Sequence, residues 1–317
     1  MDLKKINIVF MGTPEFAVPS LEILNKNFNI LAVITQEDKK SGRGKKVNMP
    51  PIKVKAIELG LPVYQFEKIN SEAAKEFLNS LDIDFIVVVA YGQILKKWLI
   101  DLPKYNCLNV HASLLPELRG ASPIQTALLQ GLKKTGITIM QIDEGLDTGD
   151  MLNKAEIEID DSMDFEDLHN KLKDLGNDIL IKSIKDIVEN KAEFVKQDSQ
   201  KATYANLIKK EDLKIDFNNK KLDIFNKVRA FSPVPGSYCY FNSKRVKIFK
   251  TSISSNFNNQ IDNFKNGDIV FITDKSLFVK CSDGVIEIIE IQLENSKRML
   301  ISEFLKGHSL KIGEQFY

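Results

Sequence analysis

The sequence predicts an α/β protein in which a Rossmann-like, doubly wound and mostly parallel sheet is followed by a small OB-like β-barrel. Three observations support this fold class. The first 190 residues alternate short apolar runs with segments of helical periodicity, which is typical of a parallel sheet covered by helices. After residue 208, short alternating runs are separated by turn residues, which fits a small barrel. With 317 residues, the chain is long enough for both parts.

The elements of the first part follow from hydrophobic periodicity, taken in chain order. An apolar run such as Phe85–Ala90 is expected where both faces of a strand are covered. The predicted strands are Ile6–Met11, Ile30–Ile34, Phe85–Ala90, Cys107–His111 and Ile137–Ile142. The predicted helices are Phe16–Leu24, Pro51–Leu59, Ser71–Leu78, Pro123–Gln130 and Phe165–Val188, the last with Asp164 as its N-cap.

The second part begins after a polar segment. Residues 191–208 lack sustained periodicity, so we expect them to form a linker between a domain at 1–190 and a barrel domain at 209–317. A helix is predicted near Lys221–Ala230. The barrel strands are predicted at Ser237–Phe241, Arg245–Thr251, Asp268–Thr273, Leu277–Cys281 and Val285–Leu293.

The composition bounds the class of protein. With 43% hydrophobic and 27% charged residues the chain has an ordinary globular composition, and no run approaches the roughly 18 apolar residues of a membrane span. The N-terminus shows no secretory pattern, so we expect a cytoplasmic protein with no membrane association, and a monomer. Cys107, Cys239 and Cys281 are isolated, which predicts buried reduced thiols and no metal site.

Charge is unevenly distributed along the chain. Residues 201–317 contain 19 Lys and Arg against 13 Asp and Glu, whereas residues 1–200 contain 25 against 30. A basic second half indicates a polyanionic partner. A solvated lysine-rich surface would have the same composition, so both interpretations stay open at this point.

A polar constellation follows the predicted strand Cys107–His111. Asn109 and His111 are two residues apart, so on a strand they face the same side, and polar groups at the exit of an inner strand are where α/β proteins bind ligands. Asp147 follows 36 residues after His111, in the loop Asp143–Asp150. An amide, an imidazole and a carboxylate together suit acyl transfer.

Both candidate groups have a plainer alternative. His111 could be a hydrogen-bonded core histidine, and the acidic loop around Asp147 could be solvated or could bind calcium. Calcium loops need alternating oxygen ligands that end in a glutamate, and Leu146 and Gly149 interrupt that pattern. We therefore favour catalysis by Asn109, His111 and Asp147.

Several motifs together resemble one family. Asn-x-His-x-Ser-Leu-Leu-Pro at 109–116, followed by Gly-Leu-Asp-Thr-Gly-Asp at 145–150, is similar to the formyltransferases that use 10-formyltetrahydrofolate. The motifs at 11–17, 41–46, 89–92, 119–125, 202–205 and 228–233 resemble the branch of that family that formylates methionyl initiator tRNA. The resemblance extends from residue 6 to about residue 315, and the order and spacing of the motifs make it specific.

This resemblance implies a reaction and its participants. The chain would transfer a formyl group from 10-formyltetrahydrofolate, as co-substrate, to the free amino group of methionyl initiator tRNA for translation initiation, and would release tetrahydrofolate. Residues 1–190 would form the catalytic domain and 209–317 the tRNA-binding barrel. Phe16 would help to form the pocket for the methionyl side chain. The loop of Ser113, Leu114, Leu115 and Pro116 would hold the folate, although a buried corner is the alternative.

A glycine-rich dinucleotide loop is absent after the first strand. The pattern G-x-G-x-x-G does not occur here, where Pro14 and Phe16 stand in the loop, so no nicotinamide cofactor is expected. The segment Gln36–Pro51 is a long basic loop, and long loops are either functional or mobile and solvated. We expect Arg43, Lys45 and Lys46 to contact tRNA.

Other functions remain open on the same fold. The Asn-His-Asp set also serves formylation of glycinamide ribonucleotide, formylation of a nucleotide-linked amino sugar and hydrolysis of the formyl group. The basic loop and second domain disfavour the first of these, and the chain has no room for the extra domain usual in the second. A non-catalytic RNA-binding protein is disfavoured by the intact Asn109, His111 and Asp147.

Overall fold

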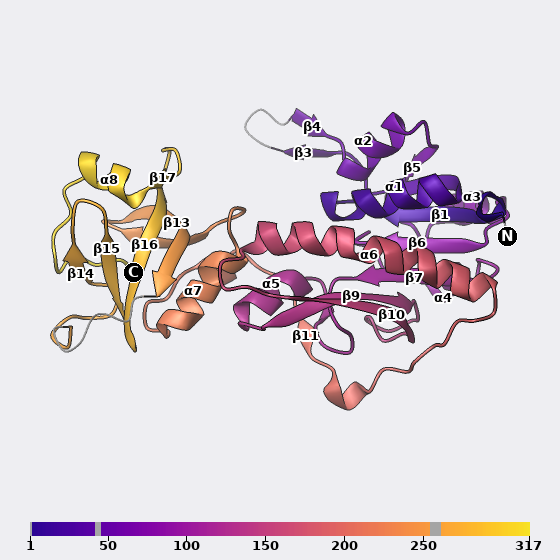
Figure 1. Cartoon of the computed structure of the whole chain (residues 1–317). Helices are drawn as coiled ribbons and strands as arrows, with labels where there is room; N and C mark the ends of the chain where they lie inside the picture. Colours follow the sequence, from indigo (N-terminus) through magenta and orange to yellow (C-terminus); the bar gives the residue numbers. More distant parts are fainter. Residues whose placement is uncertain (1, 42–45, 254–260) are drawn as a thin grey trace. The chain divides into compact units, whose positions relative to one another are not determined.

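The computed structural model describes residues 2–41, 46–253 and 261–317, and the chain divides into two compact units. Unit 1 contains residues up to Pro123, Lys134–Glu158 and His169–Ala205. Unit 2 contains Ile124–Lys133, Ile159–Leu168 and Asn206–Tyr317. Both ribbons are drawn in Figure 1. Neither unit is continuous in sequence, because the two short segments Ile124–Lys133 and Ile159–Leu168 belong to unit 2 while the residues that follow each of them belong to unit 1.

Unit 1 is built on a seven-stranded sheet in the order β10-β9-β7-β6-β1-β2-β5. Five strands are parallel: β1 (Asn7–Gly12), β2 (Asn29–Thr35), β5 (Val63–Gln65), β6 (Phe85–Val89) and β7 (Asn106–His111). The chain builds β2 and β5 on one side of β1 and then returns to place β6 and β7 on the other side. This reversal is the topological switch point, where α/β sheets bind ligands beyond the carboxyl ends of their strands.

Two antiparallel strands complete the sheet. Strand β9 (Lys134–Gln141) pairs antiparallel with β7, and β10 (Met151–Glu158) pairs antiparallel with β9. The predicted fold class is confirmed, with the departure from parallel pairing confined to this edge. Strand β10 was not predicted, because it is an edge strand whose sequence, Met-Leu-Asn-Lys-Ala-Glu-Ile-Glu, leaves alternate side chains exposed.

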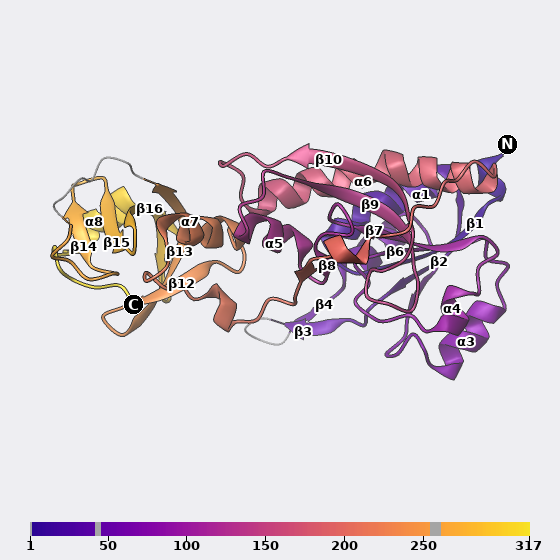
Figure 2. The ribbon, with the colours of Figure 1, turned by 90° about the horizontal axis from the view of Figure 1, so that it is seen from below.

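Helices cover both faces of this sheet (Figure 2). One face packs on α3 (Glu72–Asn79) and α4 (Lys97–Ile100), with Val9, Met11, Ala74 and Leu78 in one buried cluster. The opposite face carries α1 (Val18–Asn27) and α6 (Phe165–Val188). A Cβ atom at Gly176 of α6 would lie 3.2 Å from Val110 and 3.3 Å from Ile137, so this helix packs tightly on β7 and β9. The helix α2 (Pro51–Glu58) contacts α1 and β2.

Unit 2 contains an antiparallel sheet in the order β12-β13-β16-β15-β14, with β17 (Met299–Leu300) paired to β16. The five strands are β12 (Ser237–Phe241), β13 (Lys244–Ile253), β14 (Ile269–Ile272), β15 (Leu277–Cys281) and β16 (Gly284–Leu293). Phe316 bridges to Phe241 at one edge, and Gln315 bridges to Asp268 beside the other. The C-terminal segment thus connects the two ends of the sheet, at β12 and beside β14, which confirms a small β-barrel. Helices α7 (Lys221–Ala230) and α8 (Ile301–Gly307) pack on its strands.

The segment expected to be a linker makes specific contacts with unit 1. Strand β11 (Tyr204–Ala205) pairs with β8 (Arg119–Gly120), and Val195 bridges to Met151. The long basic loop Gln36–Pro51 contains a short hairpin of β3 (Lys39–Ser41) and β4 (Lys46–Asn48). The pairings of Tyr204 and Val195 depend on partners far away in the sequence, whereas the hairpin pairs two parts of one loop.

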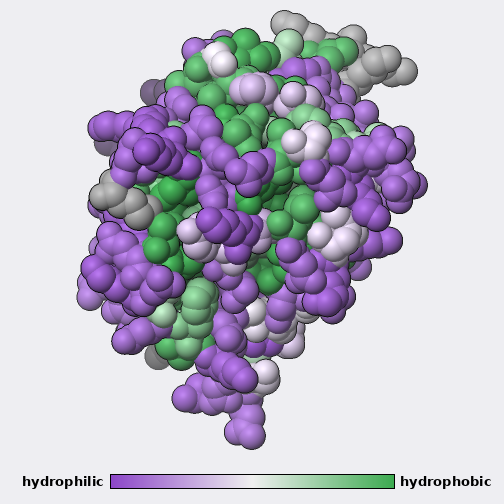
Figure 3. Space-filling view, turned by 90° about the vertical axis from the view of Figure 1, so that its right-hand side faces the viewer, coloured by the Kyte–Doolittle hydropathy of each residue, from purple (hydrophilic) through white to green (hydrophobic). Residues whose placement is uncertain are grey.

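The surface and the thiols complete the description. On the face turned to the viewer in Figure 3, hydrophilic side chains surround smaller hydrophobic patches. None of the helices in the described ranges is both long and apolar enough to cross a membrane. All three cysteines are free and buried, as predicted, and burial raises the pKa of the Cys107 and Cys239 thiols far above the ordinary value.

Candidate active site

The three predicted catalytic side chains come together at the carboxyl end of β7. Asn109 and His111 lie on this strand, and Asp147 lies in the loop between β9 and β10. The amide Nδ2 of Asn109 is 3.5 Å from Asp147 Oδ1, and Nδ1 of His111 is 3.7 Å from Asp147 Oδ2. These long separations leave the Asn109 amide and the His111 ring only weakly engaged with the carboxylate, so both can still bind a ligand atom.

The orientation of His111 follows from its second ring nitrogen. The ring is 5% exposed, and Nε2 lies 3.0 Å from the backbone oxygen of Leu118. A carbonyl oxygen can only accept, so Nε2 carries a proton and donates it to Leu118. The nitrogen turned toward Asp147 is therefore Nδ1. It offers a lone pair when the ring is neutral and an N–H donor when the ring is protonated.

Asp147 is held by its neighbours on both its side chain and its backbone. Its Oδ2 accepts a hydrogen bond of 2.8 Å from the Gly120 backbone N–H. Its φ is 52°, the left-handed region that costs free energy for residues other than glycine. Gln197 donates to the Asp147 backbone oxygen at 2.8 Å. The carboxylate is therefore aimed at Asn109 and His111 by contacts from two distant segments.

The predicted folate loop follows β7 directly and is mostly buried. The side chains of Ser113 and Leu115 have no exposed surface. Ser113 donates to the Glu117 backbone oxygen at 2.5 Å, and the Leu115 N–H donates to Thr138 Oγ1 at 3.1 Å. Leu114 and Pro116 are partly exposed. A ligand on this loop would consequently meet Leu114, Pro116 and backbone groups, and not the side chains of Ser113 and Leu115.

Lys154 reaches the same loop from β10. Its ammonium donates to the Leu115 backbone oxygen, and burial lowers its pKa. The β10 strand, which the sequence pattern did not predict, therefore supports the loop after β7.

Phe16 lies just after β1, in the 3-10 turn Glu15–Ala17. It is 7% exposed and meets His169 edge to face at 5.3 Å between ring centroids. Gly12, at the end of β1, has no room for a side chain, since a Cβ atom would lie 2.8 Å from Phe10 and 3.1 Å from the Val89 oxygen. The close approach of β1 and β6 at the switch point thus accounts for the glycine of this motif.

Sequence reasoning gave no role to four further residues of unit 1. Arg119 and Gln197 are hydrogen-bonded to each other, and Gln197 reaches the Asp147 loop. Ile94, after β6, is 82% exposed, and Leu146, beside Asp147, is 60% exposed. An apolar residue in a loop after an inner strand is a usable signal for the last two, whereas a glutamine in a polar segment carries no signal.

The structure describes one of the three cations that were predicted to contact tRNA. Arg43 and Lys45 lie outside the described residues, and Lys46 begins β4. In unit 2, the Arg245 guanidinium lies 3.9 Å from the centroid of Tyr238, and Lys214 Nζ lies 5.7 Å from that of Tyr240.

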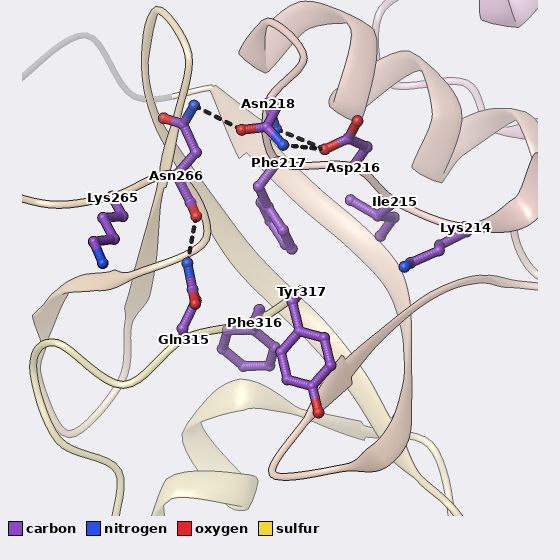
Figure 4. A pocket seen from close by; sticks show the side chains of 10 residues that line it. All are labelled: Lys214, Ile215, Asp216, Phe217, Asn218, Lys265, Asn266, Gln315, Phe316 and Tyr317. Carbon is purple, nitrogen blue, oxygen red and sulfur yellow. Dashed lines mark hydrogen bonds between the residues drawn. The ribbon is translucent and has the colours of Figure 1, made fainter.

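Unit 2 also has an open hollow of about 530 Å³ next to the C-terminal segment. Lys214 and Lys265 stand on opposite sides of it, with aromatic rings of Phe217, Phe316 and Tyr317 between them (Figure 4). Its amides bond to one another, as Asn266 does to Asn218 at 3.2 Å. Among the residues the structure describes, no group of three or more His, Cys, Asp or Glu could hold a metal ion in either unit.

Comparison with known proteins assigns the family. Residues 4–184 match the family model described as formyl transferase, and residues 207–309 match the model of the formyl transferase C-terminal domain. A methionyl-tRNA formyltransferase from Clostridium tetani is 42% identical over 309 residues, 97% of this chain and 98% of that protein. One from Caldanaerobacter subterraneus subsp. tengcongensis is 44% identical over 311 residues, 97% of this chain and 99% of that protein.

Solved structures share the fold at lower identity. WlaRD, a sugar 3N-formyl transferase, has a TM-score of 0.63 and 24% identity, covering 92% of this chain and 99% of its own. HypX from Aquifex aeolicus, in complex with tetrahydrofolic acid, has a TM-score of 0.61 and 14% identity, covering 98% of this chain and 50% of its own. These structures bear on the fold, and the two family models together with the curated relatives decide the assignment: the chain belongs to the formyl transferase family.

Proposed function

We propose that this chain transfers a formyl group from 10-formyltetrahydrofolate to the free amino group of methionyl initiator tRNA. The observation that carries the proposal is the convergence of Asn109, His111 and Asp147 beyond the carboxyl end of β7. This convergence occurs in a chain that matches methionyl-tRNA formyltransferases over 97% of its length. The product would be N-formylmethionyl-tRNA for translation initiation, which would place the reaction in the cytoplasm.

A reduced folate fits the donor site best. Two structural neighbours were solved with folates, WlaRD with 5-N-formyl-THF and HypX with tetrahydrofolic acid. Exposed Leu146 is next in sequence to Asp147, partly exposed Leu114 follows β7, and exposed Ile94 follows the adjacent parallel strand β6. These side chains would offer apolar surface for a flat ring. We expect neither a metal ion nor a nicotinamide to take part.

The proposed reaction proceeds through a tetrahedral intermediate. The methionyl amino group has an ordinary pKa of about 8, so a usable fraction is neutral and can attack the formyl carbon. Asn109 donates a hydrogen bond to the oxygen that becomes negative, and His111 can donate to it only through Nδ1, since Nε2 is bonded to Leu118. Asp147 stabilises the protonated ring and accepts the amine proton through water. The oxygen then re-forms the carbonyl, the bond from carbon to folate N10 breaks, and N10 takes up the proton that Asp147 accepted from the amine.

The barrel would contribute the tRNA-binding surface. Cations that lie over partly exposed aromatic rings can meet phosphates and unpaired bases together, as Arg245 with Tyr238 and Lys214 with Tyr240 would. The basic loop residues Arg43, Lys45 and Lys46 would grip the acceptor end next to the reacting group.

The test is direct: the protein is incubated with charged initiator tRNA and 10-formyltetrahydrofolate, and formylmethionine is measured after hydrolysis of the ester. Parallel reactions offer glycinamide ribonucleotide, a nucleotide-linked amino sugar, or no acceptor. Formylation of the tRNA alone supports the proposal. Preference for a small amine, or release of formate without an acceptor, would replace it with one of the alternative reactions.

We also predict that exhaustive chelation leaves the rate unchanged. No step of the proposed reaction needs a metal ion, so treatment with EDTA followed by gel filtration should leave kcat within about twofold. The measurement is the formylation rate before and after treatment, with the metal content checked by elemental analysis. A rate restored only by adding a divalent ion would contradict the proposed mechanism.

A further inference from the structure

We propose that Gln197 is a positioning residue for Asp147, and that the segment 195–205, which continues into the barrel, thereby holds the catalytic groups in place. This inference rests on the proposed function, because it concerns the carboxylate of that reaction. Gln197 does not touch the reacting atoms in this proposal and acts through the loop that bears Asp147.

The side-chain amide of Gln197 uses its full hydrogen-bonding capacity. Its Nε2 donates to the backbone oxygens of Asp147 and Gly149, both at 2.8 Å. Its Oε1 accepts from Nε and Nη2 of Arg119, at 3.0 and 2.8 Å. Two donors and two accepting lone pairs are the complete inventory of a primary amide. The amide therefore fixes two carbonyls that flank the turn at Asp147.

The turn it fixes cannot relax freely. Asp147 has a left-handed backbone, with φ of 52°. Two residues later, a Cβ atom at Gly149 would lie 1.8 Å from the Gln141 oxygen, so this backbone is pressed against the end of β9. A loop in such a conformation persists only when the surroundings hold it there.

The same segment holds the partners of both ionisable groups. Thr203 Oγ1 accepts from the Leu118 N–H at 2.8 Å, and the Leu118 oxygen is the acceptor for His111 Nε2. Ala205 pairs with Gly120, whose N–H donates to Asp147 Oδ2. Gly120 has φ of 116° and no room for a Cβ atom, which would lie 2.7 Å from the Ala205 oxygen. His111 and Asp147 are thus both supported through residues that contact 197–205.

Glutamine alone among the common side chains meets the requirement at position 197. Glutamate keeps the length and the acceptor for Arg119 but loses both donors and would place an oxygen against two carbonyls. Gln197→Glu should therefore release or turn the Asp147 loop while Arg119 keeps its partner. A displacement of about 1 Å in a reacting arrangement can cost roughly 100-fold in rate, so we expect kcat to fall by at least about 10-fold.

A double-mutant cycle distinguishes positioning from general stability. The steady-state formylation rate is measured over a range of tRNA and folate concentrations for the parental protein, Gln197→Glu, Asp147→Ala and the double variant. We expect Gln197→Glu to lower kcat, with KM for charged tRNA and folate and the Tm unchanged. In the Asp147→Ala background the same change should cost less than about twofold, because residues that act as a unit are not additive.

Gln200→Glu is the matched control, since it makes the same charge change at an exposed position of the same segment. Among the contacts of the described residues, the Gln200 backbone N–H is bonded to Asp198 and its side chain has no hydrogen bond. It should behave as the parental protein. If Gln197→Glu lowers the Tm, Gln197→Met, of similar length and uncharged, takes its place in the cycle. A parental kcat in the variant, an effect confined to KM, or an equal loss in both backgrounds would overturn the inference while leaving the function intact. An inactive parental protein would overturn the proposed function itself.

Discussion

The carboxyl edge of β7 and the outer face of the barrel use polar side chains in opposite ways. At the first, His111 is 5% exposed, and Asp147 receives bonds on its carboxylate and its backbone from residues 27 and 50 positions away. At the second, Arg245 and Lys214 are exposed, lie over tyrosine rings, and form no ion pair within the described part of the chain.

This difference reflects what each region has to do. Stabilising a transition state requires donors fixed at the place where charge develops, so their positions are set before the substrate arrives. Binding a phosphate backbone requires many reachable charges, each of which contributes little and is screened by salt. Single substitutions should therefore cost far more at the β7 edge than on the barrel or the basic loop.

The largest expected effect separates the two regions outright. Asn109→Ala, His111→Ala and Asp147→Ala should each lower kcat by about 100-fold or more, because each removes a group that acts in the transition state. Binding of charged tRNA, measured by filter retention, should hardly change. A substitution that leaves turnover near normal would remove that residue from the mechanism. A substitution that weakens tRNA binding as much as turnover would contradict the proposed difference between the β7 edge and the tRNA-binding surface.

An intermediate effect is expected in the basic loop. Arg43→Ala should weaken use of tRNA while folate binding stays intact, because its charge and planar donors suit phosphates and unpaired bases. Removing Lys45 and Lys46 should lower the slope of log Kd against log salt by roughly one unit for each phosphate that the loop no longer neutralises. The free loop should also be protease-sensitive and become protected by tRNA. Parental formylation by Arg43→Ala across a range of tRNA concentrations would leave recognition to the barrel.

The smallest expected effect is on the barrel. Arg245→Ala and Lys214→Ala should each raise the KM for charged tRNA a few-fold at moderate salt, with kcat unchanged, and the effect should fade as salt rises. Exposed Lys275, on the turn between β14 and β15, is the control cation and should matter less when changed to alanine. A large loss of kcat in either variant would mean that the barrel shares in positioning, and the comparison between the regions would fail.

Much of the fold was accessible from local patterns. Four of the five parallel strands, β1, β2, β6 and β7, and the five long barrel strands carry apolar residues at the period expected of buried strands, and β6 and β7 were predicted to within about one residue. The missed elements lacked that signal: β5 has three partly exposed residues, and β10 is an edge strand with polar alternate positions. The antiparallel direction of β9 and β10 depends on how the chain returns to the sheet, and the sequence of neither strand indicates it.

The candidate site, like the fold, was predictable from the sequence in part. Asn109 and His111 share a face because they are two apart on a strand, and Asp147 was selected by the motif that contains it. Which His111 nitrogen faces Asp147 depends on the Leu118 oxygen, and whether Ser113 and Leu115 face solvent depends on packing against the sheet. Both features depend on the path that the chain takes after β7, which the local sequence does not specify.

The sequence by itself determined most of the strands and helices in their order, a division into two parts, and the three polar residues that meet at the carboxyl end of β7. Periodicity and short motifs act over a few residues, where the backbone geometry is the same in any fold. Only the tertiary structure decided that Gln197 reaches Asp147 across 50 residues and that Thr203 supports Leu118 across 85. Such contacts depend on which surfaces the chain brings together after its strands and helices have packed, and a polar segment without periodicity gives no local sign of them.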